Sequence, residues 1–281
     1  MTRILIESLE DIKPQKIFFA VDGPRSNFPQ DKILVDAVKK LVTYIKWPCE
    51  IYTNFSKNNF GCGEWPMLAI SWAFKSVDKL LILEDDVRIT KNFYDLSADS
   101  LIRFNNNREI FAICASNISD YKGSETSVSI TSSKYFSGWG WATWADRWVE
   151  YKFDILQGDS LSFFTLLKKN NLNFIISLYF WYNFYQINNN QLKAWDYQIN
   201  FLLFTTQRII LKPDRNLSMN VGTGLDATHT KKLPSLILNI LPFPKNSFNY
   251  QLGVDSRKEK LWRKSRLRFL IKSTILRIYH K

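Results

Sequence analysis

Short apolar runs alternate with helical patterns over the first part of the chain, and this alternation limits the fold more than any other feature. The apolar runs have the length and residue types of buried strands, and they cover residues 16–23, 49–56, 79–87 and 110–117. Apolar residues at helical spacing occupy the segments at residues 1–12, 31–45, 64–77 and 92–107. Strands that alternate with helices predict a parallel sheet in an α/β domain.

Acidic residues directly follow two of these apolar runs. Four apolar residues lead into Glu84, Asp85 and Asp86, and the first run of the chain closes on Asp22. The carboxyl ends of parallel strands meet at one edge of a sheet, where ligands bind. We therefore expect these acids on the same edge, where their mutual repulsion has to be compensated.

Two interpretations of the acidic triplet at residues 84–86 stay open from the residues alone. Adjacent carboxylates can bind a hard divalent cation through oxygen ligands, and such a cation neutralises a diphosphate leaving group. The triplet can equally be a solvated loop after a strand. Its position after four apolar residues, on the same expected edge as Asp22, adds support to the metal interpretation.

The segment YFSGWGWATWADRW holds four tryptophans and follows a polar, serine-rich stretch. Trp139 and Trp141 lie beside glycines, including Gly140, which permit a close approach of the backbone to a ligand. We expect these two rings to be available for stacking against a ring of a ligand. Trp144 and Trp148 are expected in the core, which is the commoner position of tryptophan.

Cysteine usage points away from a disulfide framework or a zinc site. The three cysteines, Cys49, Cys62 and Cys114, are scattered and form no CxxC pair. Cys62 is expected to be a small packed residue. A reducing, cytoplasmic setting is the most consistent with this pattern.

Membrane spans are not predicted. The N-terminal segment lacks the long apolar core of a signal peptide. The longest apolar stretch, at residues 172–187, contains asparagines and is short of the roughly 20 residues that a span needs. We expect a buried or interfacial helix there.

The net charge of +12 is concentrated at the C-terminus. Residues 256–281 contain ten Lys or Arg and one Glu, which gives about +9 and leaves about +3 for the rest. Their apolar residues recur at helical intervals, as in a basic amphipathic helix that binds an anionic membrane surface. Nucleic acid binding uses the same residue types, but no recognisable nucleic-acid module accompanies the segment. A solvated tail is the third interpretation.

Five segments, in this order, resemble motifs of GT-A fold glycosyltransferases, in particular N-acetylglucosaminyltransferase I and bacterial polysaccharide and lipopolysaccharide sugar transferases. They are FFAVDGPR, LLILEDDV with the following NFY, YFSGWGWATWADRW, WDYQINF and KPDRNLSMNVGTGLDATHT, and together they span about residues 16–230. The resemblance implies a mostly parallel central sheet flanked by helices. It also implies a catalytic domain at residues 1–235, followed by a linker at 236–255 and the basic segment at 256–281. Family members usually begin with a further strand that contacts the nucleotide, and this first strand is expected to be missing here.

The resemblance also implies roles at the expected metal and donor sites. Asp86 would coordinate Mn²⁺ or Mg²⁺, and His229 would donate to the diphosphate or complete the metal shell, although a structural role for this histidine is the alternative. Asp85 would lie near the donor ribose or sugar, and Glu84 would support the cluster. The base of the nucleotide would be contacted by Asp22, with Gly23 beside it.

Asp196 would be the general base that deprotonates the acceptor hydroxyl, which implies inversion at the anomeric carbon. The alternative for Asp196 is a helix N-cap or a surface acid. On the acceptor side, Trp139, Gly140 and Trp141 would contact the sugar or acceptor.

We therefore expect a metal-dependent glycosyltransferase that moves a sugar from a nucleotide-diphosphate donor, with UDP-sugars favoured, to a glycan or lipid-linked acceptor. The enzyme would work peripherally on the cytoplasmic face of the membrane, without binding nucleic acid. One alternative is a non-catalytic relative that binds sugar nucleotides or membranes. The other is a basic nucleic-acid-binding protein.

Overall fold

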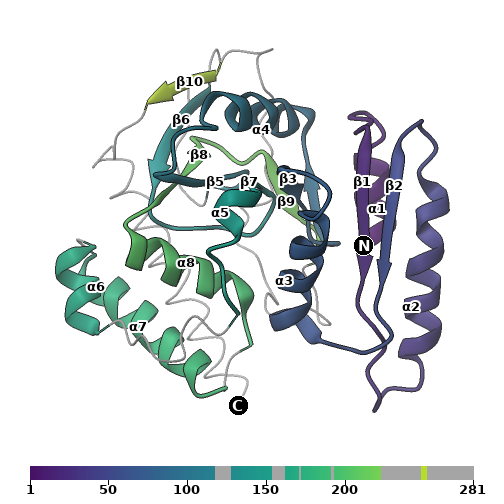
Figure 1. Cartoon of the computed structure of the whole chain (residues 1–281), viewed down its shortest axis with the longest axis horizontal. Helices are drawn as coiled ribbons and strands as arrows, with labels where there is room; N and C mark the ends of the chain where they lie inside the picture. The colour runs from purple at the N-terminus through teal and green to yellow at the C-terminus, as the bar shows by residue number, and fades with distance from the viewer. Residues whose placement is uncertain (118–127, 154–161, 171, 191–192, 223–247, 252–281) are drawn as a thin grey trace.

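A computed structural model describes the protein over most of its length (Figure 1). The residues that it describes are 1–117, 128–153, 162–170, 172–190, 193–222 and 248–251. The helices are α1 (Thr2–Ser8), α2 (Asp31–Lys40), α3 (Gly61–Ala73), α4 (Lys91–Arg103), α5 (Ala145–Trp148), α6 (Phe163–Lys169), α7 (Phe174–Asn188) and α8 (Trp195–Thr206), and a 3₁₀ turn covers Leu41–Tyr44. The strands are β1 (Lys16–Val21), β2 (Glu50–Phe55), β3 (Lys79–Ile82), β4 (Val87–Ile89), β5 (Ile110–Cys114), β6 (Val128–Ser133), β7 (Trp141–Trp144), β8 (Ile209–Pro213), β9 (Ser218–Asn220) and β10 (Phe248–Gln251).

The predicted α/β class is confirmed, but the sheet is mixed and not mostly parallel. Its order is β10-β6-β8-β5-β7-β3, and only the β10–β6 and β5–β8 pairs are parallel. The difference arises because β7, from the tryptophan-rich segment, lies antiparallel between β3 and β5, and because β6 pairs antiparallel with β8. Two smaller sheets contain β1 parallel to β2, and β4 antiparallel to β9.

The expectation that Asp22 and the acidic triplet lie on one sheet edge is wrong. Asp22 follows β1, which pairs with β2 in a sheet of its own, whereas the triplet follows β3 at the end of the large sheet. The cause is pairing: among the described strands, β3 is hydrogen-bonded to β7 and β1 to β2, and no strand pairing joins β1 to β3. In Figure 1, β1, β2 and α2 stand at the right of the molecule, beside the unit that contains the large sheet.

The large sheet separates two hydrophobic clusters, because alternate residues of a strand point to opposite faces. Ile113, Ala142 and Leu211 face the cluster that includes α4, whereas Cys114 and Trp141 face the cluster that includes α8. Each side is therefore covered by a helix whose own apolar stripe completes the packing.

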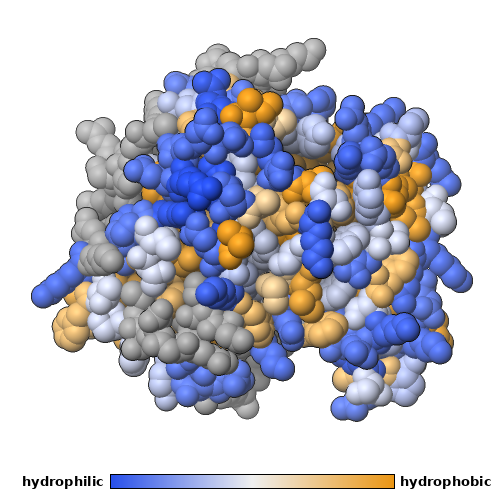
Figure 2. Space-filling view, in the orientation of Figure 1, coloured by the Kyte–Doolittle hydropathy of each residue, from blue (hydrophilic) through white to orange (hydrophobic). Residues whose placement is uncertain are grey.

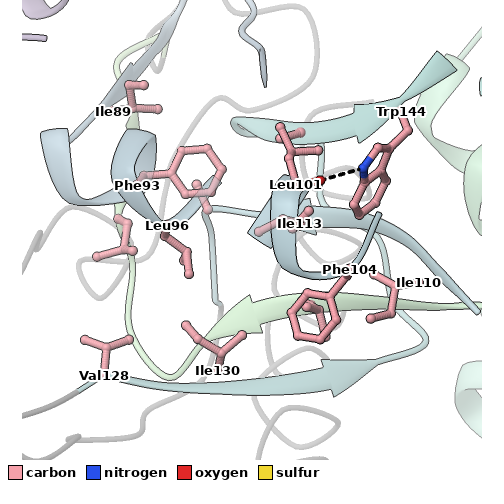
Figure 3. Close-up of a cluster of buried hydrophobic side chains, with 14 of the residues drawn as sticks. Ile89, Phe93, Leu96, Leu101, Phe104, Ile110, Ile113, Val128, Ile130 and Trp144 are labelled. Carbon is pink, nitrogen blue, oxygen red and sulfur yellow. Dashed lines mark hydrogen bonds between the residues drawn. The ribbon is translucent and has the colours of Figure 1, made fainter. Parts of the chain in front are cut away.

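The α4 side of the sheet has a dense core (Figure 3). Phe93 and Leu96 of α4 are completely buried, and Trp144 donates its indole N–H to the carbonyl of Leu101 over 2.9 Å. Trp148 lies in the opposite cluster and is 4% exposed. The predicted core positions of Trp144 and Trp148 are therefore confirmed.

A third hydrophobic cluster joins α6 and α7 to α8. Phe180 and Phe184 of α7 pack against Phe201 and Phe204 of α8. The apolar stretch at residues 172–187 thus forms a helix that is packed on one side, as predicted. Within the described residues there is no helix with the length and hydropathy needed to cross a membrane.

Strand β10 lies inside the segment that was expected to be a linker, and it extends the large sheet. It pairs in parallel with β6, and the Tyr250 hydroxyl donates to Asp99 of α4 over 2.6 Å. At least residues 248–251 therefore belong to the folded domain. The basic segment at residues 256–281 lies outside the described residues.

Candidate functional site

The acidic triplet occupies the turn between β3 and β4. The N–H of Val87 donates to the carbonyl of Glu84 over 3.0 Å and closes this turn. On its two sides, β3 pairs with β7 and β4 pairs with β9. The carboxylates are therefore fixed by strands that are distant from them in the sequence.

Glu84 is a partly buried carboxyl group held by one indole. Trp195, at the start of α8, donates its Nε1–H to Oε1 of Glu84 over 3.0 Å. Burial, followed by the charges of Asp86 and Asp196, raises the pKa of Glu84 from 4.5 to about 8. At neutral pH this side chain is mostly protonated, which relieves part of the repulsion within the triplet.

Trp195, which donates to Glu84, is itself fixed by aromatic packing. The Trp195 ring stacks on Trp141 with centroids 5.8 Å apart, and Phe136 meets it edge-on at 5.9 Å. Rings of this size bury a large apolar area and leave little freedom of rotation. The donor that satisfies Glu84 is thus a rigid part of the α8-side core.

Asp86 has one satisfied and one unsatisfied oxygen. Its Oδ2 accepts from the side-chain amide of Asn220 over 3.0 Å, and its carbonyl accepts from the N–H of Val221 over 2.7 Å. Its Oδ1 is buried and has no hydrogen-bond partner. Burial also raises the pKa of Asp86. A buried acceptor without a donor is costly, so this oxygen is a position where a cation would be stabilised.

The chain that follows β9 lies directly against Asp86. A Cβ added to Gly222 would be 2.4 Å from Oδ2 of Asp86 and 2.7 Å from its Cβ. The N–H of Gly222 donates to Oδ1 of Asn220 over 2.8 Å, which orients the amide that binds Asp86. Only glycine permits this approach, and the contact fixes the Asp86 side chain.

Hydrogen bonds that do not include the acidic residues fix the position of β9. The side-chain oxygen of Asn216 accepts from the N–H of Asn117 over 2.7 Å, and the N–H of Leu217 donates to the carbonyl of Ala115 over 3.0 Å. Ser218 then donates its hydroxyl to the carbonyl of Trp139 over 2.6 Å. These bonds join β9 to the end of β5 and to the tryptophan-rich segment.

Asp85 is the exposed member of the triplet. Its carboxylate accepts a long hydrogen bond of 3.3 Å from the Thr2 hydroxyl of α1. Its neighbours in the sequence point into the protein, so Asp85 is the triplet residue that is open to a solvent-borne ligand.

Asp196 joins the triplet from the first turn of α8. Its carboxylate accepts from the N–H of Tyr197 over 3.0 Å, and its charge contributes to the raised pKa of Glu84. A negative charge is favourable at this end of a helix. The N-cap position is Ala194, so Asp196 is not the N-cap. We refer to Glu84, Asp85, Asp86 and Asp196 as the acidic cluster.

Compensation within the triplet comes from neutral groups in the described part of the chain. Among the described residues, no ion pair includes a member of the triplet, and the side-chain donors that reach its carboxyl groups are an indole, an amide and a hydroxyl. Protonation of Glu84 adds to these bonds. The cluster therefore keeps an excess of negative charge toward solvent at Asp85.

Asp22 has a structural role that the sequence did not reveal. Its carboxylate accepts from the N–H groups of Phe60 and Gly61 over 3.0 and 2.7 Å, and from the side-chain amide of Asn59 over 3.1 Å. These donors lie at the start of α3, so Asp22 fixes where this helix begins. Gly23 is required there because its Cβ would be 2.5 Å from the backbone of Asn58.

The tryptophan-rich segment differs from the expectation at one position. Trp141 is 0% exposed and lies between Phe136, Trp148 and Trp195, so its burial does not agree with stacking on a sugar. The reason is the strand period, which turns the residue at 141 toward α8.

Trp139 and Gly140, which precede Trp141, have different surroundings. Trp139 is only partly buried and packs against the α4-side cluster. Gly140 has φ +81°, a backbone conformation that favours glycine. A Cβ added there would also lie 3.2 Å from the Ile89 side chain. Of the three residues expected at the acceptor, only Trp139 keeps an exposed part.

Three residues of the site were not predicted: Trp195 as a donor, Asn220 and Gly222. The only local signal was the short polar and glycine-containing stretch NVG after a strand. The predicted ligand His229 lies outside the described residues.

A complete metal cage is not present in the described part of the chain, where no group of three or more His, Cys, Asp or Glu side chains is arranged to hold a metal ion. The acidic cluster offers one carboxylate oxygen without a partner, Oδ1 of Asp86. Mg²⁺ is commonly bound by only one or two carboxylates together with substrate phosphates, so a complete protein cage is not required. Comparison with models of protein families finds no matching family, and comparison with curated proteins finds no significant match.

Proposed function

We propose that the protein is a metal-dependent glycosyltransferase of GT-A fold that uses a nucleotide-diphosphate sugar, with UDP-sugars favoured. The acceptor is a glycan or a lipid-linked glycan. The observation that carries the proposal is the buried Oδ1 of Asp86, which has no partner within an acidic cluster at the end of a strand. Five sequence segments resemble motifs of such enzymes and occur in the same order along the chain, which supports the same conclusion.

The residues present fit Mn²⁺ or Mg²⁺ carried by a diphosphate. Asp86 supplies a free carboxylate oxygen, and hard cations prefer oxygen ligands. Its position is fixed by Asn220 and Gly222, as a ligand requires. When bound, the cation would neutralise the negative charge of the diphosphate leaving group. His229 is a further ligand in this proposal, on the basis of the resemblance.

The other members of the acidic cluster divide the remaining tasks. Asp196 is the proposed general base, because it is partly buried and lies within electrostatic reach of Glu84. The exposed Asp85 contacts the donor ribose or sugar. Glu84, held by the Trp195 indole, keeps the cluster in place. A base that acts directly on the acceptor hydroxyl gives inversion at the anomeric carbon.

Two assignments change with the structure at hand. The Asp22 carboxylate is already engaged at the start of α3, so we assign it and Gly23 to fixing the start of this helix and not to binding the base. On the acceptor side we retain Trp139 and assign Trp141 to the core. The proposed peripheral membrane contact through residues 256–281 is supported by their charge pattern alone.

Thermal unfolding of the full chain with UDP, GDP or CDP, each with and without Mn²⁺, tests the donor site. A ligand that binds only the folded state stabilises it, by about 2.7 kcal/mol at a hundredfold excess over Kd. We expect one nucleotide to stabilise the protein only with Mn²⁺, and Asp86→Asn to abolish this effect. Asp36→Asn, on the exposed side of α2, is the matched control. Equal stabilisation of wild type and Asp86→Asn would contradict the proposal.

Turnover separates an enzyme from a non-catalytic binder of sugar nucleotides. We expect Asp196→Asn to lose sugar transfer while it keeps the Mn²⁺-dependent stabilisation by nucleotide. If wild type and Asp196→Asn bind nucleotide equally and neither transfers sugar to any glycan acceptor, the non-catalytic alternative is favoured. Salt-sensitive DNA binding that is lost on deletion of residues 256–281 would support the nucleic-acid alternative.

A further inference from the structure

Helix α7 is apolar on its outward side as well as on its inward side. Ile176, Phe180 and Phe184 are buried against the rest of the protein. The outward side chains are between 39% and 61% exposed, and all are large and apolar or aromatic: Phe174, Ile175, Leu178, Trp181, Tyr182 and Tyr185. We refer to these six residues as the outer face of α7.

The outer face of α7 is continuous. At 100° per residue its six side chains fall within an arc of about 120°, which contains no charged residue. The rings of Trp181 and Tyr185 stack with centroids 6.0 Å apart, and the Tyr182 hydroxyl accepts from Gln186 over 2.6 Å. In Figure 1, α7 lies at the lower edge of the molecule and is covered on its inner side by α8.

Helix α6 extends this apolar surface. Phe163 meets Phe174 edge-on with centroids 5.2 Å apart, and its neighbour Phe164 is 66% exposed. Figure 2 shows apolar atoms at the left edge of the molecule, where α6 lies. Large continuous apolar patches are rare on monomeric soluble proteins and mark sites of interaction.

Charge and composition identify the occupant. Residues 160–195 contain no Asp or Glu and three lysines, Lys168, Lys169 and Lys193, and the first and last of these are exposed. A helix that carries no charge of its own, followed and preceded in the sequence by lysines, is compatible with anionic lipid headgroups. Tryptophan and tyrosine, with an apolar body and a polar tip, are the residues that prefer the interface between lipid and water. A protein partner would require no such absence of acids.

We propose that the outer face of α7, together with Phe164, docks in the plane of an anionic membrane surface. The helix has 15 residues, or about 22 Å at 1.5 Å per residue, so it is too short to cross the hydrocarbon layer and lies along it. The residues of this contact differ from the basic segment at residues 256–281. It depends neither on that segment nor on the proposed transferase activity.

Flotation of the full chain with vesicles tests the proposal. The vesicles contain either phosphatidylcholine alone or phosphatidylcholine with a quarter phosphatidylglycerol. The variant combines Leu178→Ser, Trp181→Ser and Tyr185→Ser. Its matched control combines Ile33→Ser and Leu34→Ser, which remove exposed apolar side chains from α2. We expect wild type and control to bind the anionic vesicles, and the α7 variant to bind them at least tenfold more weakly.

Two results would overturn the proposal. One is equal vesicle binding by wild type and the α7 variant, which would place the whole contact elsewhere, for example in residues 256–281. The other is a lipid-free dimer that dissociates in the α7 variant while wild type ignores vesicles, which would identify a second copy as the occupant. If the triple variant fails to fold, Tyr182→Ser with Tyr185→Ser replaces it, because both side chains are 53% exposed.

Discussion

Replacement of Glu84 by glutamine should stabilise the metal-free protein, and the gain should depend on pH. In the folded state the Glu84 carboxyl is partly buried beside Asp86 and Asp196, which raises its pKa from 4.5 to about 8. Glutamine has nearly the same shape and does not ionise. Its side-chain oxygen can still accept the Trp195 N–H that now reaches Oε1 over 3.0 Å.

The size of the effect follows from the pKa difference. Because the folded pKa is raised, the contribution of Glu84 to stability is complete below pH 4.5 and is lost as the pH rises to 8. A shift from 4.5 to about 8 corresponds to at most about 5 kcal/mol at 1.36 kcal/mol per unit. The side chain keeps some exposure, so solvent screening reduces the expected loss to about 2–3 kcal/mol.

Urea unfolding in EDTA at pH 5, 7 and 9 measures this prediction. We expect wild type and Glu84→Gln to be nearly equal at pH 5, and the variant to be more stable at pH 9 by about 2–3 kcal/mol. Glu50→Gln is the control, since the pKa of this exposed glutamate is lowered by Tyr52 and Lys16, and it should give no gain at pH 9. A free-energy difference between wild type and Glu84→Gln that is the same at all three pH values would refute the reasoning.

Three further substitutions test the contacts that Glu84, Asp86 and Asp22 make. Trp195→Phe removes the N–H that satisfies Glu84 and should destabilise the fold by about 1–3 kcal/mol in urea unfolding at pH 7. Gly222→Ala places a Cβ against Asp86 and should lower both the unfolding temperature and the Mn²⁺-dependent stabilisation by nucleotide. Asp22→Ala removes acceptors for the start of α3 and should cost about 1–2 kcal/mol in urea unfolding, while the nucleotide effect in thermal unfolding persists.

Each of these three predictions has an outcome that contradicts it. Unchanged stability of Trp195→Phe would mean that the indole N–H does not satisfy Glu84. A Gly222→Ala protein with full nucleotide stabilisation would show that Asp86 adapts to the added methyl group. Loss of the nucleotide effect in Asp22→Ala, with stability unchanged, would return Asp22 to the donor site as the resemblance implies.

Local patterns were sufficient to predict the early helices and strands. The runs before Asp22 and Glu84 read as strands because both combine apolar residues with a sharp polar ending. The pairing of these strands could not be predicted in the same way. The antiparallel entry of β7 beside β3 depends on contacts between residues about 60 positions apart, which no periodicity records.

The site was predictable only in part, for the same reason. The triplet is visible in the sequence, but its donors come from residues 111 and 134 positions away, at Trp195 and Asn220. The burial of Trp141 was missed because both faces of β7 are covered, so alternation does not separate a ligand-facing ring from a core ring. The bonds of Asp22 to α3 were missed because 38 residues separate it from Phe60.

The distant partners of the acidic cluster also bear on the order of folding. The repulsion between Glu84 and Asp196 arises only when α8 reaches β3, and Asp86 meets Asn220 only when β9 pairs with β4. Contacts across such long stretches of chain form late, because loop closure has to come first. The electrostatic strain of the site is then absent from the folding transition state. Glu84→Gln should accordingly slow unfolding at pH 9 and leave the folding rate unchanged.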